Sequence, residues 1–176
     1  MDASVKKFIE ENIGLIEKND FETLYNNING LGWTVTPKDV SETLLVAGIN
    51  PLKYMSEVPR EFLYLSDVDY VDIPEGVEVI KHAAFGRCEN LLDVFIPEGV
   101  HTLKLRAFMF CSKLYRVSLP STLQIIEADV FQGCESLTDI QFRGTIDQFL
   151  NIIEKDDSLR TAATKIVCSD GTFDFE

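Results

Sequence analysis

The stretch FIPEGVHTLKLRAFMFCSKLYRVSLPSTL, residues 95–123, contains an aliphatic residue followed by proline at Ile96-Pro97 and again at Leu119-Pro120. A third pair, Ile73-Pro74, precedes Ile96-Pro97 by the same interval. Such regular spacing indicates a repeated structural unit. The fold of most of the chain therefore depends on what a unit of this length can form.

Apolar residues recur at the same interval. The clearest sets consist of phenylalanine, cysteine and leucine: Phe85, Phe108 and Phe131; Cys88, Cys111 and Cys134; Leu91, Leu114 and Leu137. A period of roughly 20 to 29 residues with fixed apolar positions is typical of a solenoid, because one unit cannot bury its own apolar side and must stack on the next. Each repeat should therefore supply one coil.

Within each unit, the pattern Leu-x-x-Val-x-Ile places two aliphatic side chains on one face, which predicts a short strand. Proline then ends the strand, because it has no N–H to donate to the next coil. The segment Ala-Phe-x-x-Cys should bring further side chains inward from the opposite wall. We predict an α/β solenoid with a parallel sheet and about three 23-residue coils.

The segment IPEGVEVIKHAAFGRCENL, residues 73–91, resembles the BspA-like bacterial leucine-rich repeats, whose units follow the pattern IPxxVxxIxxxAFxxCxxL. The resemblance covers residues 68–142 in register and continues into the tail at FRGTIDQFLNII and IVCSDGTF. It implies a leucine-rich-repeat array that acts in recognition or adhesion. The chain departs from the family at Lys81, Lys104 and Glu127, where relatives often have glycine. Many relatives are also exported.

We predict three parts: a helical N-terminal domain over residues 1–60, leucine-rich repeats over 61–142 and a C-terminal cap over 143–176. The first part should contain three helices, because apolar residues recur with helical spacing in 5–16 and 21–28, and cap residues flank 37–47. Thr36 is the expected N-cap of the third helix, and Gly48 is its expected C-cap. These helices either cover the first coil or stand apart as a binding head.

The C-terminal cap should contain a helix near residues 147–153. A hairpin through CSDGTF should follow, with Asp170-Gly171 as its turn.

The composition is that of a folded acidic protein, with 45% apolar residues and a formal net charge of −13. This charge disfavours direct binding of nucleic acid and favours basic partners, although it could serve solubility alone. The N-terminal stretch MDASVKKFIEENIG has no apolar run of the kind that a signal peptide needs, and no segment is apolar enough for a membrane span. We therefore expect a cytoplasmic protein with four free thiols.

No catalytic, phosphate-binding or zinc-protease motif is present in the sequence. The repeated cysteines should project in parallel and fill the core, whereas zinc ligands converge on one point. His82 and His101 stand at different places in their repeats, with no nucleophile placed beside them by the period. Glu75 and Glu98 share a position that is more typical of a solvated turn than of a cation site. We predict no catalytic residue, no metal and no cofactor.

The outward positions of the predicted strands supply the first candidate binding surface. They form pairs in successive coils: Tyr70 and Asp72, Asp93 and Phe95, Arg116 and Ser118, Asp139 and Gln141. Asp93, Arg116 and Asp139 should form a row of alternating charge. Tyr70, Phe95, Tyr115 and Arg116 are candidate contact residues, because exposed aromatics and arginine are typical interface anchors.

Leu105, Met109 and Phe110 supply the second candidate surface. The neighbouring repeats carry polar or small residues at the same places: His82, Gly86 and Arg87 in one coil, Ala128, Gln132 and Gly133 in the other. Since the fold does not require apolar residues there, the middle coil should display an apolar patch on the wall opposite the strands. Alternatively, the N-terminal helices or the C-terminal segment fold over it.

The leading hypothesis is a non-enzymatic protein-protein interaction module that occludes or scaffolds a protein partner. A specific form is a phage or mobile-element inhibitor of a host nucleic-acid-handling defence enzyme, in which carboxylates imitate phosphates. The expected partner is then a basic or nucleic-acid-binding protein, and neither nucleic acid itself nor a membrane. The alternative is a hydrolase or metal-dependent enzyme with its site in the helical N-terminal domain. The sequence leaves the oligomeric state open.

Overall fold

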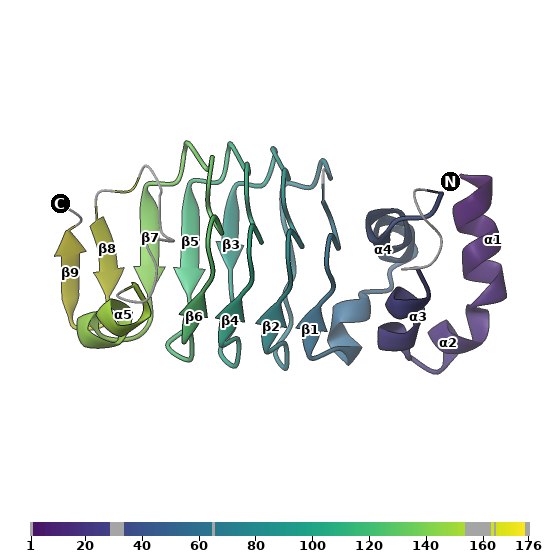
Figure 1. Cartoon of the computed structure of the whole chain (residues 1–176), viewed down its shortest axis with the longest axis horizontal. Helices are drawn as coiled ribbons and strands as arrows, with labels where there is room; N and C mark the ends of the chain where they lie inside the picture. The colour runs from purple at the N-terminus through teal and green to yellow at the C-terminus, as the bar shows by residue number, and fades with distance from the viewer. Residues whose placement is uncertain (1, 29–33, 65, 154–162, 164, 175–176) are drawn as a thin grey trace.

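The computed structural model describes residues 2–28, 34–64, 66–153, 163 and 165–174. Over these described residues the molecule is elongated, with four α-helices at one end, a solenoid in the middle, and a helix with a hairpin at the other end (Figure 1). A continuous core of buried side chains runs from the helices through the coils to the C-terminal hairpin. The predicted solenoid is therefore confirmed.

Two sheets form two walls of the solenoid. The first sheet, sheet A, has very short strands in the order β1 (Glu57–Val58), β2 (Val79–Ile80), β4 (Thr102–Leu103) and β6 (Ile125–Ile126). The second, sheet B, has the order β3 (Asp93–Phe95), β5 (Arg116–Leu119), β7 (Asp139–Phe142), β8 (Lys165–Cys168) and β9 (Gly171–Asp174). Sheet B is the predicted parallel sheet, in which the described strands β8 and β9 pair antiparallel. Sheet A was not predicted, because its strands are too short to show an alternating pattern.

The repeated residues form the core in the predicted register. Val94 pairs with Val117, and Val117 with Ile140. The rings of the three repeated phenylalanines stack, with centroids 5.2 Å apart between Phe85 and Phe108 and 5.6 Å apart between Phe108 and Phe131. Buried aromatic pairs of this kind stabilise a core beyond the area that they bury.

The repeated cysteines are buried, as the core interpretation predicts. The thiol of Cys88 donates to the carbonyl of Leu63 at 3.0 Å. Those of Cys111 and Cys134 donate to the equivalent carbonyls of Phe85 and Phe108, at 3.2 and 3.1 Å. Each cysteine thus satisfies a carbonyl of the preceding coil.

These contacts lead to a prediction for the thiols. The neighbouring thiols of Cys134 and Cys88, together with burial, raise the pKa of Cys111 well above its usual range. Since parallel side chains do not turn toward each other, we expect no disulfide along the row. Thiol titration in denaturant without reductant should count four free cysteines, and the native protein should react slowly. A Cys88–Cys111 crosslink in freshly purified protein would contradict this geometry.

One coil precedes those that the sequence pattern revealed. β1 pairs with β2, and Val58 lies opposite Ile80. The separation of these two residues in the sequence is one residue less than the repeat length. In this first coil Leu63 holds the place of Phe85, and Ser66 holds the place of Cys88. The predicted strand at 68–74 is not a strand in the structure, although Val71 and Ile73 are buried and Tyr70 and Asp72 exposed. The domain boundaries after residues 60 and 142 stay a prediction.

The N-terminal part has more helical segments than predicted: α1 (Ala3–Glu11), α2 (Ile13–Glu17), α3 (Phe21–Ile28), α4 (Pro37–Val46) and the short 3-10 helix η1 (Pro51–Tyr54). The first predicted helix is broken at Asn12, whose side-chain amide donates back to the carbonyl of Phe8 and competes with the helical backbone. The third begins as predicted, but its C-cap is Ala47, one residue before the predicted Gly48. Thr36 and Asp39 form a capping box, and Gly48 follows the cap residue with φ 79°.

The helices pack directly on the first coil. The ring of Tyr25 lies 5.8 Å from that of Phe62, and the hydroxyl of Ser66 donates to the carboxylate of Glu42 on α4 at 2.6 Å. Behind this contact, the hydroxyls of Tyr25 and Ser41 share a buried hydrogen bond of 2.7 Å. The helices therefore cover the apolar end of the solenoid, which an open array would expose.

The C-terminal cap contains α5 (Ile146–Ile153) and the β8–β9 hairpin, as predicted. The ring of Phe149 lies 5.7 Å from Phe142 and 6.1 Å from Phe173 and closes the core. The predicted turn was wrong by one residue. Gly171 pairs with Cys168, so the turn residues are Ser169 and Asp170.

Candidate functional site

The outward face of sheet B brings the strand candidates together. The register places Phe95, Ser118, Gln141 and Val167 in one row across β3, β5, β7 and β8. Phe95 is 58% exposed and Tyr115, directly before β5, is 40% exposed. Exposed aromatic side chains are unfavourable in water, and at these places they add no contacts to the core. They are therefore candidates for contact with a partner.

Arg116 joins the aromatic residues to the charged row. Its Nε lies 2.7 Å from Asp139 Oδ2, and its guanidinium lies over the ring of Tyr115, 5.3 Å from the centroid. The hydrogen bond with Asp139 raises the pKa of Arg116 above its usual value. Asp93 occupies the predicted row on the other side but makes no ion pair in the described part of the chain. The register therefore confirms the predicted row of Asp93, Arg116 and Asp139. Within this row, the ion pair joins Arg116 to Asp139.

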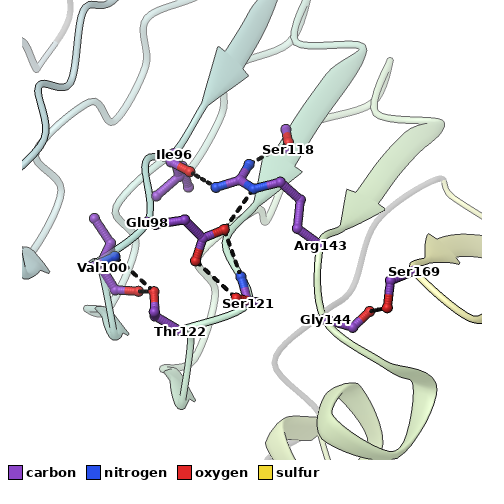
Figure 2. A network of polar contacts seen from close by, with 10 residues as sticks. Ile96, Glu98, Val100, Ser118, Ser121, Thr122, Arg143, Gly144 and Ser169 are labelled. Carbon is purple, nitrogen blue, oxygen red and sulfur yellow. Dashed lines mark hydrogen bonds and ion pairs between the residues drawn. The ribbon is translucent and has the colours of Figure 1, made fainter.

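Arg143 is a functional candidate that the sequence analysis missed. Figure 2 shows its guanidinium bonded to three residues of earlier coils: Nε lies 2.8 Å from Glu98 Oε1, and the terminal nitrogens donate to Ser118 Oγ and to the Ile96 carbonyl, each at 2.6 Å. The same guanidinium lies 4.4 Å from the centroid of the Phe95 ring. Arg143 therefore holds the exposed Phe95 ring in place.

A signal for Arg143 is present in the repeat. Residue 143 follows Pro120 at the same interval that separates Pro120 from Pro97, so an arginine stands where the period predicts proline. Its backbone N–H donates to the carbonyl of Leu119 at 3.0 Å, which proline could not do. The sequence shows that an arginine replaces the expected proline, but it does not show that this arginine contacts two earlier coils.

Glu98 completes the network. Ser121 donates to it twice, from the backbone at 3.2 Å and from the hydroxyl at 3.0 Å. Partial burial opposes ionisation of Glu98, but the hydrogen bonds from Arg143 and Ser121 outweigh it and hold its pKa below the usual value. Glu98 is therefore a hydrogen-bond acceptor for Arg143 and Ser121. Among the described residues, no three or more histidine, cysteine or acidic side chains form a cluster that could hold a metal ion.

The apolar residues of the opposite wall, Leu105, Met109 and Phe110, are less exposed to solvent than predicted. Leu105 and Met109 are half-buried, whereas Phe110 is exposed, at 40%. The Phe110 ring occupies the space above Gly133, where an added Cβ would lie 2.1 Å from a ring carbon. Arg87 lies 5.4 Å from the centroid of the same ring. Neighbouring coils therefore partly cover the ring, and Phe110 takes part in packing between coils.

The two histidines lie in different surroundings. Burial and the nearby Arg60 lower the pKa of His82, and its buried Nδ1 has no hydrogen-bond partner among the described residues. His101 Nδ1 lies 2.9 Å from Thr102 Oγ1, and its Nε2 lies 3.8 Å from Glu78. The Thr102 hydroxyl thus lies beside a base, but Thr102 is only 4% exposed, which leaves a substrate little access to this hydroxyl.

A cavity of about 420 Å3 lies between α3, the start of α4 and the first coil. Its charged lining residues include the ion pairs Lys81–Glu57 and Arg60–Glu61. Residues 29–33 lie between two of its lining residues, Ile28 and Val35, and fall outside the described part of the chain. We therefore assign no ligand to this cavity.

The stacked coils, the rows of identical core residues and the exposed strand wall define a solenoid of the leucine-rich-repeat class. The chain belongs to the family described as BspA type leucine rich repeat region, which matches residues 56–161 in six copies. The match begins at residue 56, directly before the first coil that the sequence period missed. Repeats of this class typically mediate protein binding, and the class is generally non-enzymatic.

Two solved structures are similar to the chain. A leucine-rich repeat protein from Bacteroides ovatus is 24% identical over 61% of this chain and 28% of its own, with a TM-score of 0.50. A leucine rich cell surface protein from Faecalibacterium prausnitzii is 27% identical over 44% of this chain and 23% of its own, with a TM-score of 0.40. This chain thus spans about a quarter of the length of either protein. No curated protein is significantly similar in sequence.

Proposed function

We propose that this chain is a protein-binding module that acts without catalysis, and that its contact surface is the outward face of sheet B. The observation that carries the proposal is the exposed Phe95 ring, which the Arg143 guanidinium holds on the face from 4.4 Å. A ring that is both exposed and fixed loses little conformational entropy on binding. Tyr115 and Arg116 extend the same surface by one coil.

In the more specific form of the proposal, the partner is a basic protein and the chain inhibits a nucleic-acid-handling enzyme, as a phage or mobile-element protein would. The net charge of −13 supports this form, because it steers basic partners and repels nucleic acid. The free thiols agree with a cytoplasmic location, where reducing conditions prevail. Among the described residues, no helix is long and apolar enough to cross a bilayer.

The test is a pull-down from the native host, followed by affinity measurements with two triple variants. Phe95→Ala/Tyr115→Ala/Arg116→Ala should weaken binding of the captured partner by roughly thirtyfold or more, since anchors of this kind typically contribute about 2 kcal/mol or more. Leu105→Ala/Met109→Ala/Phe110→Ala is the matched control on the opposite wall and should stay within about threefold of the wild type.

Thermal melting should accompany both variants, so that loss of fold is not mistaken for loss of contact. If both folded variants bind normally, the interface lies on the helices and the strand-face proposal is wrong. If only the opposite-wall variant loses affinity, the module binds through Phe110 and its neighbours.

A further inference from the structure

Sheet B begins one coil later than sheet A, and this leaves an irregular edge beside β3. Residues 68–73 of the first coil follow the path of a strand, with Val71 and Ile73 buried and Tyr70 and Asp72 exposed. The backbone hydrogen bond from Leu92 to the carbonyl of Asp69, at 3.3 Å, connects this segment to the next coil. In the described part of the chain, the backbone N–H groups of residues 70–72 donate no hydrogen bond.

An apolar cavity of about 160 Å3 lies at this edge. Its lining comes from the end of α4, from η1 and from the first two coils, and it includes Leu45, Leu52, Val68 and Phe85. The exposed Tyr70 and Asp72 also line it, so it opens at the surface. A cavity of roughly 150 Å3 with such a lining can hold a group the size of benzene. One aliphatic or aromatic side chain is therefore a suitable occupant.

The strand side of the first two coils carries charge of one sign. On the strand side of the first two coils, residues 66–76 and 89–99 contain no lysine or arginine. They contain exposed carboxylates that make no ion pair in the described part of the chain: Asp67, Asp69, Asp72, Glu75, Glu89 and Asp93. The next coil reverses this pattern, because residues 112–122 contain Lys113 and Arg116 and no acidic residue. The negative potential is thus local to the edge that holds the cavity.

We propose that this edge is a docking site for an extended, basic segment of a partner protein, which inserts one aliphatic or aromatic side chain into the cavity. The lysine or arginine side chains of the segment would lie over the exposed carboxylates. Its backbone carbonyls would accept from the N–H groups of Tyr70 and Asp72, because alternate residues of an extended segment face opposite sides and Asp69 faces the second coil. Charge complementarity selects this occupant over an acidic or neutral segment. The inference rests on the proposed protein-binding function and names the chemistry of the partner.

The experiment selects peptides from a random library of dodecamers on the immobilised full-length chain. Enriched sequences should carry lysine or arginine on both sides of an aliphatic or aromatic residue. Their affinity is then measured by fluorescence anisotropy for the wild type and for two variants. Leu45→Phe fills the cavity, and Asp69→Lys/Asp72→Lys reverses the charge at its opening. Each should weaken binding at least tenfold.

Matched controls separate the site from general effects. Leu105→Phe makes the same substitution at a half-buried leucine on the opposite wall. Glu10→Lys/Glu11→Lys changes the net charge equally on α1, where both residues are exposed. Both controls should stay within about twofold of the wild type. Because Asp69 and Asp72 are exposed, the charge reversal should fold even if Leu45→Phe does not.

Enrichment of acidic or uncharged peptides, equal losses in the controls, or no enriched peptide at all would each overturn the inference. Its failure is distinguishable from failure of the proposed function. If the captured partner needs Phe95, Tyr115 and Arg116 but ignores Leu45→Phe and the charge reversal, the strand face is the interface and the cavity is not.

Discussion

Replacing Phe108 by alanine should lower the free energy of unfolding by about 3 to 5 kcal/mol, the range for deletion of a buried aromatic side chain. Phe108 is fully buried and stacks on both sides, against Phe85 at 5.2 Å and Phe131 at 5.6 Å. Neither neighbour can fill the space, because each is held by its own coil. Chemical denaturation followed by circular dichroism measures the loss.

Tyr70→Ala is the matched control, since Tyr70 is also aromatic but 64% exposed. Its effect should stay below about 1 kcal/mol, as is usual for surface substitutions. Equal denaturation midpoints for Phe108→Ala and the wild type would contradict the stacked core. The comparison thus tests the register of the coils directly.

The sequence was sufficient for the regular coils because their side chains repeat at a fixed interval and face a continuous core. The interval alone places Phe85, Phe108 and Phe131 in one row, and their rings stack in the structure. Local signals were sufficient where the chemistry is local, as in the capping box of Thr36 and Asp39. These features share one property, since each depends on residues at known separations along the chain.

The features that the sequence did not predict depend on contacts between residues at irregular separations along the chain. The first coil was missed because it is one residue shorter than the period, with Leu63 and Ser66 in place of phenylalanine and cysteine. The break at Asn12 depends on one side-chain amide bond to Phe8. On the opposite wall, an apolar patch was predicted from the residues that differ between aligned repeats, and the packing of Phe110 over Gly133 reduces its exposure.

Replacing Arg143 by alanine should lower the free energy of unfolding by about 2 to 3 kcal/mol, because charged donors lose their bonds to the Ile96 carbonyl, Ser118 and Glu98. Arg143→Lys should recover little of this loss, since an ammonium group lacks the planar fork that reaches three acceptors. Arg143→Pro restores the residue that the repeat predicts, yet it should be the least stable of the three. It loses the guanidinium and also the backbone bond to Leu119.

The dependence of this loss on pH tests the role of Glu98. The pKa of Glu98 is lowered in the folded protein, because Arg143 and Ser121 together outweigh its burial. The stabilisation from its ionised form is therefore present above its ordinary pKa of 4.5 and is lost as the pH falls through the lower, folded value. The difference in stability between the wild type and Arg143→Ala should narrow over that interval. A difference that stays constant from pH 6 down to about pH 3 would show that Arg143 acts through Ile96 and Ser118 alone.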